Sequence, residues 1–287
     1  MISVEEAIKI ILKEIKPSLQ EAVPLLEALD RVIFEDTKSH IDIPGFDNSA
    51  MDGFAVKDTD TKSATNQAPR SLKLIEQIKA GSLAKKSIRK GETIKIMTGA
   101  PLPQGANAVV MVEDSEILAD EKGSQPLVKI KREVILEENI RKVGENIRKG
   151  ETVIPKGTRL KEAHLGLLAS LGIKKVKVFR KPRFAILSTG DELIELGKKL
   201  TPGKLYSSNV YAIWAQLTKC GAHPFDLGIA RDNFPDLKAK IIECLKYDAI
   251  VTSGGVSAGD YDLVIPMLKE LKADIKFWKI GERPSRS

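Results

Sequence analysis

The feature that most restricts the fold of this chain is an alternation of apolar runs with amphipathic segments in its C-terminal part. The apolar runs lie at 184–187, 226–229, 249–252 and 275–278, and the segments with helical periodicity lie between them at 209–218, 235–245 and 262–271. Strands that are apolar along their whole length and alternate with helices are typical of a parallel sheet covered on both faces. The sequence therefore predicts an α/β fold from about residue 183 onward.

The N-terminus carries the pattern of an amphipathic helix over residues 3–15. Ser3 stands three residues before Glu6, which is the spacing of a capping box, and Pro17 blocks continuation of the helix. Apolar residues recur between these ends at steps of three and four, at Val4, Ala7, Ile8, Ile11, Leu12 and Ile15. We expect this stripe to pack against the core.

Residues from about 40 to 140 have a different texture. Short β-branched runs, such as 92–97 and 108–112, are separated by Gly, Pro and Asn, which indicates a mainly β insert. The pentapeptide Arg-Lys-Gly-Glu-Thr occurs at 89–93 and again at 148–152, each time before an apolar segment. The repeat predicts two similar turns that each lead into a strand.

Composition argues against several classes of protein. The chain has 287 residues, of which 42% are hydrophobic, 30% charged and 5% aromatic, a profile typical of soluble proteins with two or more domains. No apolar run approaches the roughly 20 residues that span a bilayer, and the N-terminus lacks a secretory signal, so we expect a cytoplasmic protein without a membrane partner. The net charge of +7 comes with alternating Lys and Glu and few aromatics, which argues against nucleic-acid binding.

The cysteines and tryptophans are expected to be packed side chains without a metal-binding or disulfide role. Cys220 and Cys244 are too few and too far apart to predict a zinc site or a disulfide framework, and we expect both to be buried thiols. Trp214 falls in a predicted helix and Trp278 in a predicted strand, where we expect core packing.

Polar residues follow three of the predicted strands. The first strand runs into Ser188, Thr189, Gly190, Asp191 and Glu192, the second leads to Asp232, and the third runs into a Gly-rich turn that begins Ser253-Gly254-Gly255-Val256-Ser257 and ends at Asp262. In parallel sheets ligands bind at the carboxyl ends of the strands, and the amides of such a turn can hold a phosphate. Helix N-capping would also explain Asp232 and Asp262, but not Glu192. Carboxylates that converge beside a phosphate imply a bridging divalent cation, most often Mg²⁺.

Several motifs resemble the signatures of one enzyme family. The segment 46–55, Phe-Asp-Asn-Ser-Ala-Met-Asp-Gly-Phe-Ala, and the segments 97–103 and 105–110 are similar to the first two signatures of the molybdopterin molybdenumtransferases, the family that includes the E domain of gephyrin. Further signatures are matched in the same order at 144–147, 188–193 and 253–262. The resemblance covers essentially the whole chain.

The resemblance implies three domains and a homodimer. The implied domains are a three-layer αβα molybdopterin-binding domain of residues 1–24 and 178–287, a linking domain of residues 25–40 and 141–177, and an inserted mainly β domain of residues 41–140. Family members resemble elongated homodimers in which the inserted domain of one subunit reaches the α/β domain of the other. Asp52 and Thr98 would then act across the subunit interface.

The reaction that the resemblance implies uses adenylylated molybdopterin and molybdate, releases AMP and leaves molybdenum on the dithiolene sulfurs. The implied catalytic residues are Asp52, Thr98, Glu192, Asp232 and Asp262, of which the last three would also hold Mg²⁺. The implied substrate-binding residues are Ser188, Thr189, Gly190, Ser253, Gly254, Gly255, Ser257, Arg283 and Arg286. Molybdopterin adenylyltransferase is a candidate partner.

Three features depart from the family pattern. Asn146 stands where many relatives carry an acidic residue, and Arg283-Pro284-Ser285-Arg286 stands in place of a Lys-Pro-Gly-Lys element. The sequence ends at Ser287, before the Gly-Asn-Pro-containing loop and the C-terminal β domain that the family usually has.

Two alternatives to a molybdopterin molybdenumtransferase stay open. One is a molybdopterin-binding or scaffold module without turnover, and the other is a molybdopterin adenylyltransferase, against which the Ser-Ala-Met-Asp-Gly and Thr-Gly-Ala-Pro segments argue.

Overall fold

The computed structural model describes residues 2–118, 126–255, 263–278 and 280–281. The chain divides into two compact units, of which unit 1 comprises Met1–Glu35 and Lys156–Ser287 and unit 2 comprises Asp36–Pro155. The predicted β insert falls within unit 2, whereas the boundaries of the three predicted domains stay predictions. Among the described residues, no helix has the length and apolar character needed to cross a bilayer.

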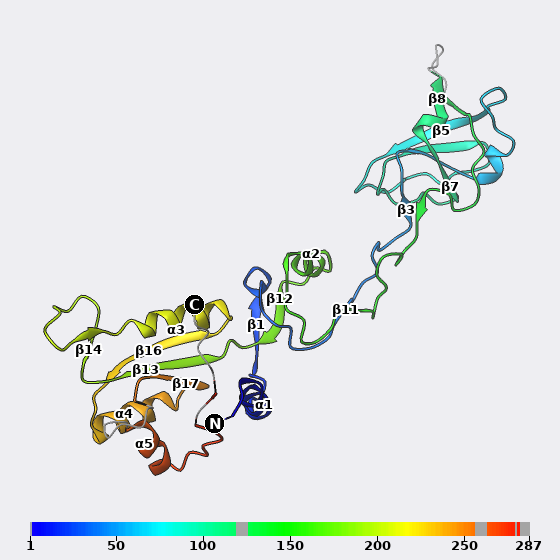
Figure 1. The fold of residues 1–287 in the computed structure, drawn as a ribbon. Coiled ribbons are helices and arrows are strands. Elements are labelled where there is room, and N and C mark those ends of the chain that lie inside the picture. The colour runs from blue at the N-terminus through cyan, green and yellow to red at the C-terminus, as the bar shows by residue number, and fades with distance from the viewer. Residues whose placement is uncertain (1, 119–125, 256–262, 279, 282–287) are drawn as a thin grey trace. The chain divides into compact units, whose positions relative to one another are not determined.

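Three parallel strands form the sheet of unit 1, in the order β16-β13-β17. The central strand is β13 (Arg183–Thr189), and its neighbours are β16 (His223–Ala230) and β17 (Ala249–Ser253). Figure 1 shows one helix on one face of this sheet, α3 (Asn209–Lys219), and two on the other, α4 (Phe234–Cys244) and α5 (Val264–Glu270). Since both faces of β13 are covered, its last five residues are all buried. The α/β fold predicted from the apolar runs is confirmed.

The strand predicted at 275–278 is wrong. Residues 273–278 belong to no strand of the described part of the chain, and a single backbone bridge joins Ile2 to Ile280 beyond them. Phe277 lines an apolar groove together with Ile11 and Ile250. Phe277 is therefore accounted for by this groove and not by sheet pairing.

The other elements of unit 1 are short. They are α1 (Val4–Glu14), β1 (Gln20–Pro24), η1 (Leu25–Ala28), α2 (Glu162–Ser170), β12 (Lys175–Phe179), β14 (Leu193–Ile194) and β15 (Leu205–Tyr206). β1 and β12 form an antiparallel pair, and β14 and β15 form a parallel pair. The hydroxyl oxygen of Ser3 accepts the amide of Glu6 at 3.1 Å, as the capping spacing predicts.

Several burial predictions in unit 1 are wrong. In the α1 stripe Ala7 is buried, but Ile8 is 50% exposed and Leu12 is 66% exposed. Cys244 is buried as predicted, whereas Cys220, Trp214 and Trp278 are exposed. Cys220 and Trp214 lie off the stripe of Val210, Ile213 and Leu217, which are the least exposed residues of α3. Helical periodicity thus located the helices but did not decide which stripe meets a partner.

A six-stranded mixed sheet forms the body of unit 2, in the order β7-β4-β6-β5-β9-β8. Its strands are β4 (Gly53–Val56), β5 (Arg70–Ile78), β6 (Glu92–Ile96), β7 (Ala108–Met111), β8 (Ser115–Leu118) and β9 (Leu127–Ile130). β5 and β6 run parallel, and the other neighbours run antiparallel. Alternate residues of β4 enter two different apolar clusters, Phe54 in one and Ala55 in the other. The mainly β character predicted for this segment is confirmed.

Smaller elements complete unit 2. They are the strands β2 (Thr37–Lys38), β3 (Asn48–Ser49), β10 (Ile140–Arg141) and β11 (Thr152–Ile154) and the short helices η2 (Asp58–Thr61) and η3 (Val112–Asp114). β2 pairs with β11, and β3 pairs with β10.

The repeated pentapeptide forms the two similar turns that the sequence predicts. The carboxylate of Glu92 accepts the amide of Arg89 at 2.9 Å, and the amide of Glu92 donates to the carbonyl of Arg89 at 3.1 Å. The carboxylate and amide of Glu151 make the same two bonds to Arg148, each at 3.0 Å. Each turn leads into a strand, β6 in the first case and β11 in the second. The repeat is therefore a local turn motif.

Candidate functional site

The carboxyl ends of the three parallel strands bring the predicted polar loops together. Thr189 lies opposite Ala230 in the pairing of β13 with β16, and Ser188 lies opposite Ser253 in the pairing of β13 with β17. The amide of Gly190 donates to the carbonyl of Ala230 at 3.2 Å. Ser188 and Thr189 are buried, at 2% and 5% exposure. The segments that the sequence predicts as one site are therefore neighbours at one end of the sheet.

Two aspartates join the loops after β13 and β16. Asp232 Oδ2 accepts the amide of Asp191 at 3.1 Å, and the amide of Asp232 donates to Asp191 Oδ1 at 3.4 Å. The side chain that caps α4 belongs to Asn233, whose Oδ1 accepts the amide of Asp236 at 3.0 Å. Helix N-capping therefore does not account for Asp232, and its link to Asp191 does.

The carboxylate of Glu192 lies directly over the backbone of Gly190. A Cβ atom added to Gly190 would stand 2.5 Å from both carboxylate oxygens. The backbone at Glu192 is held because its carbonyl accepts the amide of Leu205 at 2.8 Å. No residue of the described segments donates a hydrogen bond to the carboxylate itself. Within the described segments, Glu192 thus combines a fixed backbone with carboxylate oxygens that accept no hydrogen bond.

The Gly-rich turn begins in close contact with Thr189. A Cβ atom at Gly254 would lie 2.7 Å from the carbonyl oxygen of Thr189, and one at Gly255 would lie 2.8 Å from Thr189 Oγ1. Both glycines also have positive φ, 97° and 67°, so their backbone conformation and the available space each require glycine. The other residues predicted for the turn and the C-terminal end, Ser257, Asp262, Arg283 and Arg286, lie outside the described residues.

Two polar residues at the entry to α3, Ser207 before the helix and Asn209 as its first residue, belong to the same site, although the sequence-based prediction omits them. The hydroxyls of Ser207 and Ser188 share a buried hydrogen bond of 2.8 Å. Asn209 Nδ2 donates to Ser253 Oγ at 2.9 Å. Both contacts therefore fix a hydroxyl of a predicted substrate-binding residue. The signal that could have revealed them is the Ser-Ser-Asn run at 207–209, where a polar loop enters an apolar helix.

Asp52 and Thr98 form a separate polar cluster in unit 2. A single carboxylate oxygen, Asp52 Oδ1, accepts both the amide and the hydroxyl of Thr98, each at 2.7 Å. These two hydrogen bonds hold the pKa of Asp52 below its usual value, and the charge of Lys95 acts more weakly in the same direction. Asp52 is exposed and is therefore an ionised carboxylate at neutral pH. The structure brings these two predicted residues, 46 positions apart, into direct contact, while their role stays a prediction.

The backbone that carries Asp52 is set by close packing of the segments 46–55 and 97–103. The amide of Ser49 donates to the carbonyl of Ala100 at 3.0 Å, and the amide of Gly99 donates to the carbonyl of Ser49 at 2.8 Å. Gly53 leaves no room for a side chain, because a Cβ atom there would stand 1.9 Å from the carbonyl oxygen of Val110. The two segments therefore form one continuous surface of unit 2.

The described carboxylates of unit 1 suit a magnesium ion. Glu192 and Asp232 follow adjacent strands and offer the hard oxygen donors that Mg²⁺ prefers. Within the part of the chain that the structure describes, no three His, Cys, Asp or Glu side chains are grouped to hold a metal, and the third predicted ligand, Asp262, lies outside it. Mg²⁺ commonly takes one or two protein carboxylates and fills its shell with water and substrate phosphates, so the chemistry and number of the donors at Glu192 and Asp232 match those that this ion usually takes.

Two family models match the chain in succession. The MoeA N-terminal region (domain I and II) matches residues 2–172, and the probable molybdopterin binding domain matches residues 185–287. The second match contains the loops at the ends of β13, β16 and β17, and the first contains Asp52 and Thr98. The two polar clusters thus fall in different matched regions.

Similar proteins carry a shared name. A molybdopterin molybdenumtransferase of Bacillus subtilis is 37% identical over 284 residues, which are 99% of this chain and 66% of the relative. The molybdopterin molybdenumtransferase of Haemophilus influenzae is 35% identical over 288 residues, which are 100% of this chain and 69% of the relative. The crystal structure of a molybdopterin biosynthesis MoeA protein from Pyrococcus horikosii has a TM-score of 0.82 at 35% identity and covers 94% of this chain and 67% of that one. The chain spans about two thirds of the length of these relatives. On these matches, the chain belongs to the MoeA family of molybdopterin molybdenumtransferases.

Proposed function

We propose that this chain inserts molybdenum into adenylylated molybdopterin and releases AMP, the last step of molybdenum cofactor biosynthesis. The observation that carries the proposal is the junction of the three strand ends, where Asp191 and Asp232 join two loops and the Gly-rich turn packs on Thr189. This junction lies in the region that matches a molybdopterin binding domain. Glycine amides beside carboxylates suit a substrate that carries phosphates and a cation.

The proposed reaction has two parts. Water adds across the phosphoanhydride bond, so that AMP leaves and molybdopterin keeps its own phosphate. The two dithiolene sulfurs then bind the molybdenum of molybdate, and one oxo ligand leaves as water with the two thiol protons, so that the oxidation state of molybdenum does not change. Ser253, Gly254 and Gly255 would hold the pterin phosphate, and Asn209 would orient the hydroxyl of Ser253 through its hydrogen bond. Ser188, Thr189, Gly190, Ser257, Arg283 and Arg286 complete the proposed binding residues.

We propose Mg²⁺ as the cofactor, held by Glu192 and Asp232 together with Asp262. Bound there, the ion would offset negative charge on the phosphates during cleavage. Asp191 would act as a positioning residue, because its amide and its carboxylate both engage Asp232. Replacing Asp191 by Ala is expected to weaken the binding of Mg²⁺, so that AMP release needs a higher concentration of Mg²⁺. The contact of the Gly-rich turn with Thr189 is expected to stay intact.

The proposal includes the architecture implied by the family. We propose a three-layer αβα domain, a linking domain and an inserted β domain, assembled as a homodimer in which Asp52 and Thr98 of one subunit serve the site of the other. The ionised state of Asp52 supports a role beside a cationic or proton-donating group. A molybdopterin adenylyltransferase is the proposed supplier of the adenylylated substrate.

The test is to mix the purified chain with adenylylated molybdopterin, molybdate and Mg²⁺ and to measure AMP release and molybdenum incorporation. We expect the two products in equal amounts, and a Glu192→Gln variant is expected to lose both. Glu113→Gln is the matched control, because Glu113 is an exposed glutamate of unit 2. Tight binding without AMP would instead support a binding or scaffold module, and pyrophosphate release from ATP would support an adenylyltransferase. Either outcome overturns the proposal.

A further inference from the structure

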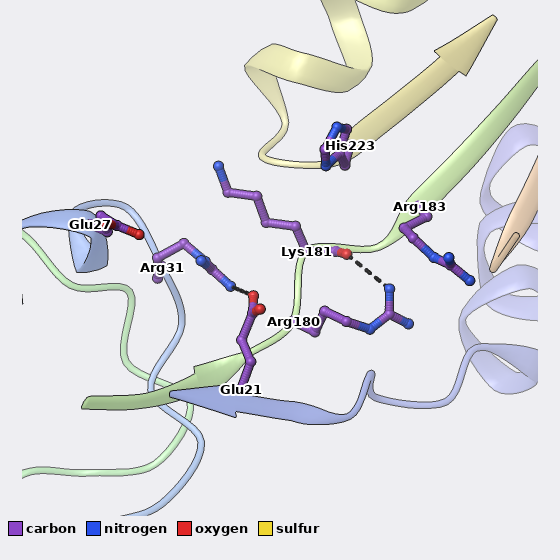
Figure 2. Close-up of a pocket in the computed structure, with 7 residues that line it drawn as sticks. All are labelled: Glu21, Glu27, Arg31, Arg180, Lys181, Arg183 and His223. Atoms are coloured by element: carbon purple, nitrogen blue, oxygen red, sulfur yellow. Dashed lines mark hydrogen bonds and ion pairs between the residues drawn. The ribbon is translucent and has the colours of Figure 1, made fainter. Parts of the chain in front are cut away.

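A basic pocket lies at the amino end of the sheet in unit 1, opposite to the strand ends described above (Figure 2). Arg183 is the first residue of β13 and His223 the first of β16, and the two are register partners. The six steps along β13 from Arg183 to Thr189 correspond to about 20 Å. This distance along the strand separates the pocket from the proposed catalytic site. The volume of the pocket is about 560 Å³.

Three arginines of this pocket are held in place by their neighbours. The guanidinium of Arg31, 9% exposed, pairs with Glu21 and donates to the carbonyl of Phe179 at 2.9 Å. Arg180 donates to Asp248 Oδ1 at 2.8 Å. Arg183 donates to the carbonyl of Lys246 at 2.7 Å. The walls of the pocket are thus preorganised by contacts within unit 1.

Two basic side chains of the pocket have no such partners. Among the described residues, none forms an ion pair or a hydrogen bond with the ammonium of Lys181 or the ring nitrogens of His223. The ring of His223 stacks on Phe225 at 4.7 Å between centroids, which leaves its edge nitrogens available. Lys181 and His223 also lie on the exposed surface, where a ligand can reach them.

The charges of the pocket do not balance. Arg31, Arg180, Lys181 and Arg183 are cationic at neutral pH, and the carboxylates of Glu21 and Glu27 line the same pocket. Asp248 takes up part of the remaining charge through Arg180 and Arg183. A net positive charge is left even with His223 neutral, and Lys181 is the cation that no described carboxylate neutralises.

We infer that this pocket binds a small phosphate-bearing anion, as free phosphate or as a phosphate ester. Its volume is that of a small-molecule site, which favours a metabolite over a protein segment. Donors of three shapes surround it, namely planar guanidinium groups, an ammonium and an imidazole, which suits the oxygens of a tetrahedral dianion better than one planar carboxylate. A bound dianion would also stabilise the charged form of His223.

The three histidines of the chain provide the test. His223 lines the pocket, His40 lies in unit 2, and the ring of His164 accepts the amide of Lys161 at 3.0 Å in α2. We would titrate the full chain with glycerol phosphate, inorganic phosphate, and chloride at matched ionic strength, and follow the three imidazoles by NMR. The expected result is a saturable change of the chemical shifts of the His223 imidazole alone.

Variants make the test decisive. Lys181→Met keeps an unbranched side chain that is one atom shorter and removes the charge, and we expect it to weaken phosphate binding at least tenfold. Lys73→Met is the control, because Lys73 is an exposed lysine of β5 in unit 2. A response to inorganic phosphate as strong as that to the ester would identify free phosphate as the ligand, and a response to the ester alone would identify an ester. No saturable shift, equal shifts of all three histidines, or an unchanged Lys181→Met response would overturn the inference, whatever the activity of the chain.

Discussion

Asp52 both anchors the backbone of Thr98 and carries a negative charge, and substitution can separate the two properties. In Asp52→Asn the amide oxygen can still accept the two hydrogen bonds of Thr98, but the charge is lost. We expect this variant to fold as the wild type and to lose AMP release by roughly 10²-fold, the scale of removing one charged group from a reaction site. Steady-state AMP release, measured beside thermal unfolding, checks this. Full activity in Asp52→Asn would show that Asp52 only anchors the backbone of Thr98 and that its charge is not needed.

The same residue makes a prediction about pH. Because the folded-state pKa of Asp52 is lowered, ionised Asp52 stabilises the fold above the ordinary pKa of an aspartate, and this contribution is lost as the pH falls through the lowered value. The stability difference between the wild type and Asp52→Ala is therefore expected to shrink as the pH falls below about 4, the ordinary pKa of an aspartate. Denaturant unfolding of both proteins across that range measures it. A difference that stays constant would contradict the assigned cause.

At the scale of elements, the pairing of β4 with β7 depends on the absence of a side chain at Gly53. A methyl group there would meet the carbonyl oxygen of Val110, so Gly53→Ala is expected to destabilise unit 2 by about 1–3 kcal/mol or more. Both tryptophans lie in unit 1, so tryptophan fluorescence would not report the unfolding of unit 2. Hydrogen exchange at the amides of Ala55 and Val110 is therefore the suitable measurement. Protection should fall in unit 2 and stay unchanged in unit 1.

Gly166→Ala is the matched control for Gly53→Ala. Gly166 lies in the middle of α2, and an added Cβ would meet no atom within 4 Å. Alanine is favoured over glycine in a helix interior, so this variant is expected to stabilise unit 1 by about 0.5–1 kcal/mol. Equal loss of protection in the two variants would show that the close approach at Gly53 is not the cause.

At the scale of the whole molecule, the proposed function assigns catalytic roles to residues of both units. Asp52 lies in unit 2 and Glu192 in unit 1. If the site is assembled from two subunits, mixing Asp52→Ala with Glu192→Ala chains under exchange should restore roughly a quarter of the wild-type activity, because half of the dimers would carry one intact site of two. The measurement is AMP release before and after exchange.

The control for this experiment mixes two variants of the same unit. Glu192→Ala and Asp232→Ala both lie in unit 1, so their mixed dimers have no intact site and are expected to stay inactive. If the Asp52→Ala and Glu192→Ala mixture also stays inactive although mixed dimers form, the two residues do not serve a shared site across subunits.

Much of the fold could be predicted because its signals are local. The apolar runs of β13, β16 and β17 predict strands because strands in a covered parallel sheet are buried on both faces. Ser3 predicts the start of α1 at Val4 because its hydroxyl accepts a free amide of the first turn. The signals failed where an apolar run had more than one possible partner. Residues 275–278 form no strand, Phe277 lines a groove, and the α1 stripe is largely exposed.

The sequence by itself determined which residue types follow each strand, and with them the loops that carry the candidate site. That Asp52 shares one oxygen with both donors of Thr98, that Asp191 and Asp232 exchange bonds across 41 positions, and that Asn209 holds Ser253 were decided only by the tertiary structure. A hydrogen bond between distant residues requires its donor and acceptor to be placed to within a fraction of an ångström, and strand register sets that placement. Composition and periodicity do not encode that register, because it results from packing the whole sheet at once.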